Sequence, residues 1–180
     1  MATQLLQERP GAVTFKGSPK TLVGPELHVG DPLPEFTLVG TKLDEHTPRT
    51  LTDNGKRAAL LIVVPSLDTS VCSLESNKFN ARLEEVPEGV WAYVVSRDLP
   101  FAMQRWKHAQ EGVKLLQMLS DYKDHSFGRS TGLEIKELGL LARAVLVVGR
   151  DGRVRYEELV TEVASEPNYD EAIAAARSVV

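Results

Sequence analysis

An unbroken apolar run from Ala58 to Val64 is the feature that most constrains the fold. A run without alternation is typical of a strand that is buried on both faces, as in a parallel sheet covered by helices. Pro65 follows and ends the strand, because proline cannot donate a hydrogen bond to a neighbouring strand. A helix is expected next, from about Val71 to Glu85. This order predicts an α/β domain built around a central strand.

The remainder of the chain continues the alternation of strands and helices. Further strands are predicted at Gly89–Ser96, Leu115–Leu119, Ala144–Val148 and Arg153–Leu159, and helices from Pro100 onward and over Tyr169–Ser178. Parallel strands need crossover helices between them, and Asp151-Gly152 is typical of a hairpin turn. The order predicts a thioredoxin-like fold, with a central mixed sheet flanked by helices.

The first fifty residues are less regular. Residues 13–24 predict an N-terminal β-hairpin extension with its turn at Gly17-Ser18-Pro19. Glu35–Val39 and Thr47–Leu51 are expected to form another strand pair. We expect residues 1–180 to form a single domain, because this length suits one hydrophobic core.

Charge and composition exclude several classes of partner. The net charge is −4, and no basic stripe with interleaved aromatic residues suggests nucleic-acid binding. No segment approaches the ~20 apolar residues that a membrane span needs, and we see no secretory signal. A single cysteine excludes an intramolecular disulfide and a Cys-x-x-Cys site. We therefore expect a cytoplasmic protein.

That cysteine, Cys72, falls in the first turn of the helix after the central strand. Unpaired backbone N–H groups and the positive end of the helix dipole favour a thiolate at such a position. A thiolate, unlike a thiol, attacks peroxides. An alternative is a purely structural role, because Cys72 shares one helix face with Phe79, Leu83 and Val86, and free cysteine is often a small core residue.

The residues before Cys72 have a defined spacing. Pro65, Thr69 and Cys72 give the pattern Pro-x-x-x-Thr-x-x-Cys. This pattern resembles the active-site motif of the peroxiredoxins. The resemblance implies that the threonine hydroxyl and the cysteine N–H hold the peroxide oxygens, and that the proline shields the sulfur from water. Thr69 could also simply cap the helix, and Pro65 could simply end the strand.

Further segments resemble the bacterial thiol peroxidase subclass of this family, in the same order along the chain. They are Val13–Lys20, Lys78–Asn80, Ser96–Ala102, Leu141–Val145, Leu159–Glu162 and Glu166–Tyr169. The resemblance assigns to Arg143 the arginine that stabilises the thiolate and the peroxide. Without it, Arg143 could be an ordinary charge at the end of a strand. The resemblance also implies a homodimer and no metal or organic cofactor.

One expected residue of the subclass is missing. Most thiol peroxidases carry a resolving cysteine after the Asp-Leu-Pro-Phe-Ala segment, and its place falls at Lys107. We therefore expect a thiol peroxidase of the 1-Cys type, which reduces hydrogen peroxide and organic hydroperoxides through a sulfenic acid on Cys72. An external thiol would regenerate it, either a low-molecular-weight thiol or a thioredoxin-like or glutaredoxin-like protein. An apolar rim from Leu67, Val71 and Phe101 would suit organic hydroperoxides.

Two other classes remain open. A thioredoxin-fold binding or redox-sensing protein would keep the fold without peroxidase turnover. A cysteine hydrolase or transferase would need a histidine or an equivalent base beside the thiol. The four histidines, His28, His46, His108 and His125, show neither proximity to the motif in sequence nor metal-ligand spacing.

Overall fold

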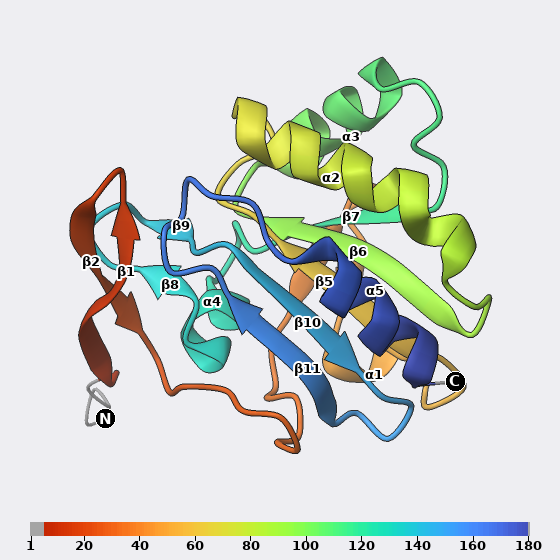
Figure 1. Cartoon of the computed structure of the whole chain (residues 1–180), viewed down its shortest axis with the longest axis horizontal. Coiled ribbons are helices and arrows are strands. Elements are labelled where there is room, and N and C mark those ends of the chain that lie inside the picture. Colours follow the sequence, from red (N-terminus) through yellow and green to blue (C-terminus); the bar gives the residue numbers. More distant parts are fainter. Residues whose placement is uncertain (1–5, 180) are drawn as a thin grey trace.

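A seven-stranded mixed sheet forms the centre of the structure, a computed structural model that describes residues 6–179 (Figure 1). Its strands are ordered β11 (Val154–Leu159), β10 (Ala144–Val148), β5 (Ala58–Val63), β6 (Val90–Ser96), β7 (Leu116–Ser120), β3 (Leu38–Gly40) and β4 (Glu45–His46). β5, β6 and β7 are parallel, and the other pairs are antiparallel. The apolar run forms the inner strand β5, between β10 and β6, which is fully buried as predicted.

Helices cover both faces of this sheet. On one face, α2 (Ser70–Arg82), α3 (Pro100–Ala109) and α5 (Tyr169–Ser178) pack on a core that includes Leu60 and Ile62 (Figure 1). On the other, α1 (Pro48–Leu51) and α4 (Ser126–Thr131) pack on a core that includes Leu61 and Val63. Alternate residues of β5 thus serve opposite cores. The last three residues of the helix predicted to end at Glu85 form a separate short 3-10 helix, η1 (Leu83–Glu85), which directly follows α2. These elements confirm the predicted thioredoxin-like α/β order.

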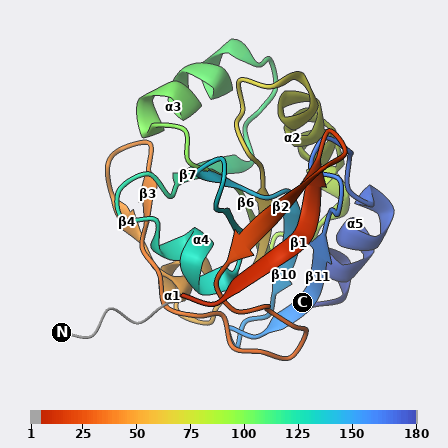
Figure 2. The same cartoon turned by 90° about the vertical axis from the view of Figure 1, so that its left-hand side faces the viewer.

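A second, four-stranded sheet lies at one end of the molecule (Figure 2). It consists of β1 (Glu8–Phe15), β2 (Ser18–Val23), β8 (Glu134–Ile135) and β9 (Leu140–Leu141), in that order. The predicted N-terminal hairpin is present, but the predicted turn is wrong by one to two residues. Lys16 and Gly17 form it with φ values of 50° and 77°, and Ser18 and Pro19 already belong to β2. Left-handed backbone at both positions suits a tight hairpin.

The predicted strand at Thr47–Leu51 is wrong, because this segment is helical. Pro48 occupies the first turn of α1, where its missing N–H costs nothing. Thr47 and Thr50 form a reciprocal capping box. The partner of β3 is instead the two-residue strand β4. Between residues 6 and 179, no helix is both long and apolar enough to cross a membrane.

Candidate active site

Cys72 lies in the first turn of α2, directly beyond the carboxyl end of β5. Its backbone N–H donates to Oγ1 of Thr69, the residue that caps the helix, at 3.4 Å. The cysteine is fully buried and belongs to the same core cluster as Phe79 and Leu83. Cys72 therefore lies on the apolar face of the helix, as its spacing from Phe79 indicated, and its sulfur is buried rather than exposed to solvent.

Arg143 approaches the sulfur from the start of β10. Its Nη2 donates to Cys72 Sγ at 3.3 Å, and its Nε donates to the carbonyl of Val163 at 2.9 Å. Its Nη1 pairs with Glu75. The side chain is only 2% exposed, so the charge is held by these partners rather than by water. Burial lowers the pKa of Arg143, but Glu75 and Cys72 more than offset this effect and leave the pKa raised.

Glu75 is a site residue that sequence reasoning missed. It is buried one helical turn after Cys72, and its Oε1 has no hydrogen-bond partner among residues 6–179. Burial raises the pKa of Glu75 to about 7, although Arg143 acts in the opposite direction. The signal in the sequence was its i+3 spacing from Cys72, which places both side chains on the same side of the helix.

A cavity of about 240 Å³ opens above the sulfur. Pro65 lines one side of it, and its polar side chains are those of Lys16, Ser66, Thr69, Ser70 and Arg143. Its apolar part is formed by Phe15, Val71, Ile135, Leu138, Leu140 and Val163. The structure thus brings all four predicted site residues, Cys72, Thr69, Arg143 and Pro65, to one cavity.

The expected apolar rim is only partly correct. Val71 lines the cavity, but Leu67 is buried in the core and Phe101 is a solvent-exposed residue of α3 that does not line it. The apolar lining comes instead from the second sheet, chiefly from the β8–β9 hairpin. β8 and β9 were not predicted, so this wall could not be anticipated.

The loop between β5 and α2 is fixed from below by Asp98. Its carboxylate accepts hydrogen bonds from Ser66 Oγ at 2.7 Å and from the N–H of Leu67 at 2.8 Å. Ser96 Oγ donates to the same carboxylate at 2.7 Å. These bonds satisfy a loop that must turn sharply between strand and helix, and they hold Thr69 and Cys72 in place.

No histidine lines this cavity within the part of the chain that the structure describes. The charged groups that contact the sulfur or its arginine are Arg143 and, behind it, Glu75, and Lys16 also lines the cavity. Arg143 is a permanent cation and cannot take a proton from the thiol. The arrangement can hold an anionic sulfur next to hydrogen-bond donors, which suits attack on a small electrophile rather than the base-assisted chemistry of a hydrolase.

Comparison with known proteins gives a consistent result. The Redoxin family model matches residues 28–173. The thiol peroxidase of Clostridium acetobutylicum is 48% identical over 166 residues, which are 92% of this chain and 98% of that protein. The thiol peroxidase of Bacillus subtilis is 43% identical over 93% of this chain and 98% of that protein.

A solved structure is similar over nearly the whole chain. The crystal structure of a peroxiredoxin-like protein from Aquifex aeolicus has a TM-score of 0.85 at 38% identity, and it covers 97% of this chain and 99% of that one. The thiol peroxidase from Chromobacterium violaceum shares the fold, with a TM-score of 0.79 at 20% identity over 88% of this chain and 91% of that one.

Proposed function

The chain belongs to the thiol peroxidases of the redoxin family, and from this premise we propose that Cys72 is the residue with which it reduces hydroperoxides. Thiol-dependent reduction of peroxides is the activity of this group. The observation that carries the assignment to Cys72 is the 3.3 Å contact between its sulfur and Arg143 Nη2 at the cavity. A buried arginine that donates to a sulfur stabilises the thiolate more than the thiol.

In the first step, the Cys72 thiolate attacks one oxygen of the peroxide in line with the O–O bond. The S–O bond forms as the O–O bond breaks, and the leaving oxygen takes a proton to become water or an alcohol. Arg143 is placed to stabilise the charge that moves from sulfur to the leaving oxygen. Thr69 donates its hydroxyl hydrogen to the Ser66 carbonyl at 3.0 Å and accepts from the Cys72 N–H, so the second lone pair of its oxygen can accept a hydrogen bond from the peroxide. Pro65 lines the cavity without an N–H and excludes water there.

In the second step, a thiol from outside the chain reduces the sulfenic acid. One thiol displaces water and forms a mixed disulfide, and a second thiol releases Cys72 and leaves as the oxidised disulfide. Cys72 is the only cysteine, so no step of this sequence can form an internal disulfide. We propose a low-molecular-weight thiol, or a thioredoxin-like or glutaredoxin-like protein, as the reductant, and a reducing, cytoplasmic location.

The proposal is tested by peroxide consumption with dithiothreitol as the reductant, for the natural protein and for Cys72→Ser. We expect turnover only with Cys72, because the serine hydroxyl is not a nucleophile at neutral pH. Turnover by Cys72→Ser would refute the assignment. A single addition of peroxide separates the enzyme from a redox sensor without turnover, since a sensor would form the sulfenic acid once and then consume no more peroxide.

We further propose that the protein is a single domain over residues 1–180 and that it forms a homodimer. Two large apolar side chains at the start of α3 support the dimer, because Leu99 and Phe101 are 52% and 63% exposed. Both residues come shortly after Asp98, whose carboxylate holds the β5–α2 loop of the active site. Light scattering on a size-exclusion column should give twice the mass of the 19.8 kDa chain, and Phe101→Glu should yield the monomer.

A further inference from the structure

One wall of the Cys72 cavity is formed by the β8–β9 hairpin. Ile135 on β8, Leu138 in the turn and Leu140 on β9 all line the cavity. Each strand of this hairpin has only two residues, and its turn returns through Gly139 at a positive φ. So few ladder hydrogen bonds hold a hairpin only weakly, and its position must depend on other contacts.

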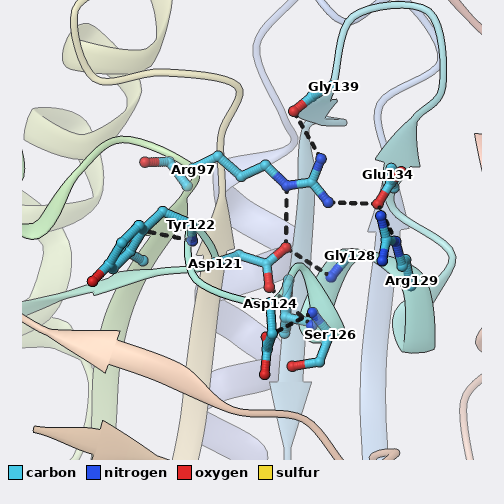
Figure 3. Close-up of polar contacts among 12 residues, drawn as sticks. Arg97, Asp121, Tyr122, Asp124, Ser126, Gly128, Arg129, Glu134 and Gly139 are labelled. Atoms are coloured by element: carbon cyan, nitrogen blue, oxygen red, sulfur yellow. Dashed lines mark hydrogen bonds and ion pairs between the residues drawn. The ribbon is translucent and has the colours of Figure 1, made fainter.

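Part of its support comes from the second sheet, where β8 pairs with β2 and the Glu137 carboxylate accepts from the Thr21 N–H. Arg97 adds contacts from the central sheet. It follows β6 directly, and its guanidinium reaches three acceptors on different segments (Figure 3). Nη1 donates to the Gly139 carbonyl at 2.7 Å, Nη2 to Glu134 Oε2 at 2.6 Å, and Nε to Asp121 Oδ2 at 3.3 Å. Two of these acceptors, Gly139 and Glu134, belong to the hairpin, while Asp121 follows β7.

Arg97, Asp121 and Glu134 form a largely buried ion-pair network that has little freedom to move. The Arg97 side chain is 6% exposed and Asp121 is fully buried, so each charge depends on the other in place of water. Asp121 is held in turn by the N–H groups of Phe127 and Gly128 at the start of α4. Glu134 also accepts from Arg129 Nε at 3.1 Å. A planar guanidinium donates from three separate nitrogens and can span such acceptors, whereas the three donors of an ammonium group share one nitrogen.

Arg97 and its neighbour Asp98 act on opposite walls of the same cavity. Asp98 holds the β5–α2 loop, on which Ser66 and Thr69 lie, and Arg97 holds the hairpin that supplies the apolar lining. Arg97 and Asp98, the two residues that follow β6, thus determine the distance between the polar wall and the apolar wall of the cavity.

We infer that Arg97 is a positioning residue that fixes the apolar wall and thereby determines how well the cavity accepts organic hydroperoxides relative to hydrogen peroxide. The inference rests on the proposed function of Cys72. Arg97 does not itself line the cavity, so it acts through Ile135, Leu138 and Leu140. The organic group of a hydroperoxide would pack on these side chains, whereas hydrogen peroxide has no group that reaches them.

The test compares the rate constants of Cys72 oxidation by cumene hydroperoxide and by hydrogen peroxide in single-turnover measurements. The variants are Arg97→Lys, which keeps the charge, and Glu134→Gln, which keeps the shape and removes the ion pair. We expect each variant to lower the ratio of the two rate constants by about fourfold, the factor that corresponds to loss of contact with one methylene group. Arg82→Lys is the control, because Arg82 bonds to Glu85 and Asp170 alone among residues 6–179 and does not line the cavity.

The outcomes separate the inference from the function on which it rests. An unchanged ratio in both variants, or an equal change in Arg82→Lys, would overturn the role of Arg97 while leaving Cys72 as the peroxidatic residue. A natural protein that is not oxidised by either peroxide would refute the proposed function itself. Should Arg97→Lys fail to fold, Glu134→Gln alone decides, since Glu134 is partly exposed and a glutamine there can still accept a hydrogen bond from Arg129.

Discussion

Arg143 is a buried residue that contacts the sulfur of Cys72 and also links separate segments of the core. It contacts Cys72, Glu75 and the Val163 carbonyl from three different segments. Arg143→Lys keeps a positive charge but cannot reach all three partners. We expect Arg143→Ala to slow Cys72 oxidation about 10²–10³-fold, as for the loss of one oxyanion-type donor, and Arg143→Lys to slow it less. Stopped-flow mixing with hydrogen peroxide measures both.

The slower reaction of Arg143→Ala bears on the mechanism only if this variant is folded. Urea unfolding is the necessary control, because removal of Arg143 leaves the buried carboxyl of Glu75 without its partner. Unchanged oxidation kinetics in a folded Arg143→Ala protein would exclude Arg143 from the mechanism.

Glu75 predicts a pH dependence of stability. Burial raises its pKa from 4.5 to about 7, so the folded protein binds this proton more tightly than the unfolded chain does. Its contribution to the free energy of unfolding is complete below pH 4.5 and is lost as the pH rises through 7. Glu75→Gln should therefore gain stability relative to the natural protein across this window, by about 3 kcal/mol, since a tenfold change in proton affinity corresponds to ~1.4 kcal/mol.

Urea unfolding at a series of pH values measures this difference. Glu137→Gln is the matched control, because hydrogen bonds from Thr21 lower the pKa of this exposed glutamate. Its contribution changes below pH 4.5, so the difference between Glu137→Gln and the natural protein should stay flat from 4.5 to 7. A flat difference for Glu75→Gln as well would contradict the prediction.

At the scale of elements, the β5–α2 loop depends on Asp98. Asp98→Asn keeps the shape but replaces one acceptor oxygen by a donor that faces Ser66 or Leu67. We expect the free energy of unfolding to fall by about 1–3 kcal/mol, the cost of one unsatisfied buried donor, and Cys72 oxidation to slow because the loop positions Thr69. Chemical denaturation and stopped-flow oxidation check the two effects.

A matched substitution exists in another loop. Asp124 is an exposed residue just before α4, and its carboxylate accepts a hydrogen bond from the N–H of Ser126, the first residue of that helix. Asp124→Asn keeps an acceptor for that N–H and should change neither stability nor oxidation rate appreciably. If Asp98→Asn behaves like Asp124→Asn, the loop is not held by the Asp98 carboxylate.

The long elements were predictable because each carries its own signal. The apolar run of β5, the proline that starts α3 and the Asp151-Gly152 turn were sufficient to order the central sheet. Around the start of α2, the Pro-x-x-x-Thr-x-x-Cys spacing located Pro65, Thr69 and Cys72, and family resemblance added Arg143. These residues do meet in the structure.

The short elements were not predictable, and the cavity depends on them. β8 and β9 have two residues each, too few for a periodic pattern, and they form because Ile135 and Leu141 are buried against other segments. α4 begins after His125, which has a left-handed backbone and no side-chain cap, so its start signal is missing. Long-range contacts of this kind are invisible in a local reading of the sequence.

At the scale of the whole molecule, the single cysteine predicts sensitivity to over-oxidation. Without a resolving cysteine, the sulfenic acid on Cys72 persists when reductant is scarce and reacts again with peroxide. Mass spectrometry after stepwise addition of peroxide should show one oxygen on Cys72, then two and three. Failure to find any oxygen adduct on Cys72 would refute this expectation.

Lys107→Cys provides the converse experiment. Lys107 lies on α3, where its Nζ donates to the Leu116 carbonyl of β7. A cysteine there restores the resolving position that the subclass usually has, so we expect peroxide to produce an internal disulfide with Cys72 and few over-oxidised products. Lys114→Cys, in the loop after α3, is the control and should remain as sensitive as the natural protein.

The absence of a second cysteine also makes the oxidation state of Cys72 depend on two concentrations outside the protein. A cysteine on the same chain would act at a fixed effective concentration, in the millimolar range for a short tether, whatever the thiol supply. Here the rate of regeneration scales with the free thiol, and the rate of oxidation scales with the peroxide. In the steady state, the oxidised fraction of Cys72 therefore follows the ratio of peroxide to thiol, so that one buried sulfur compares two concentrations.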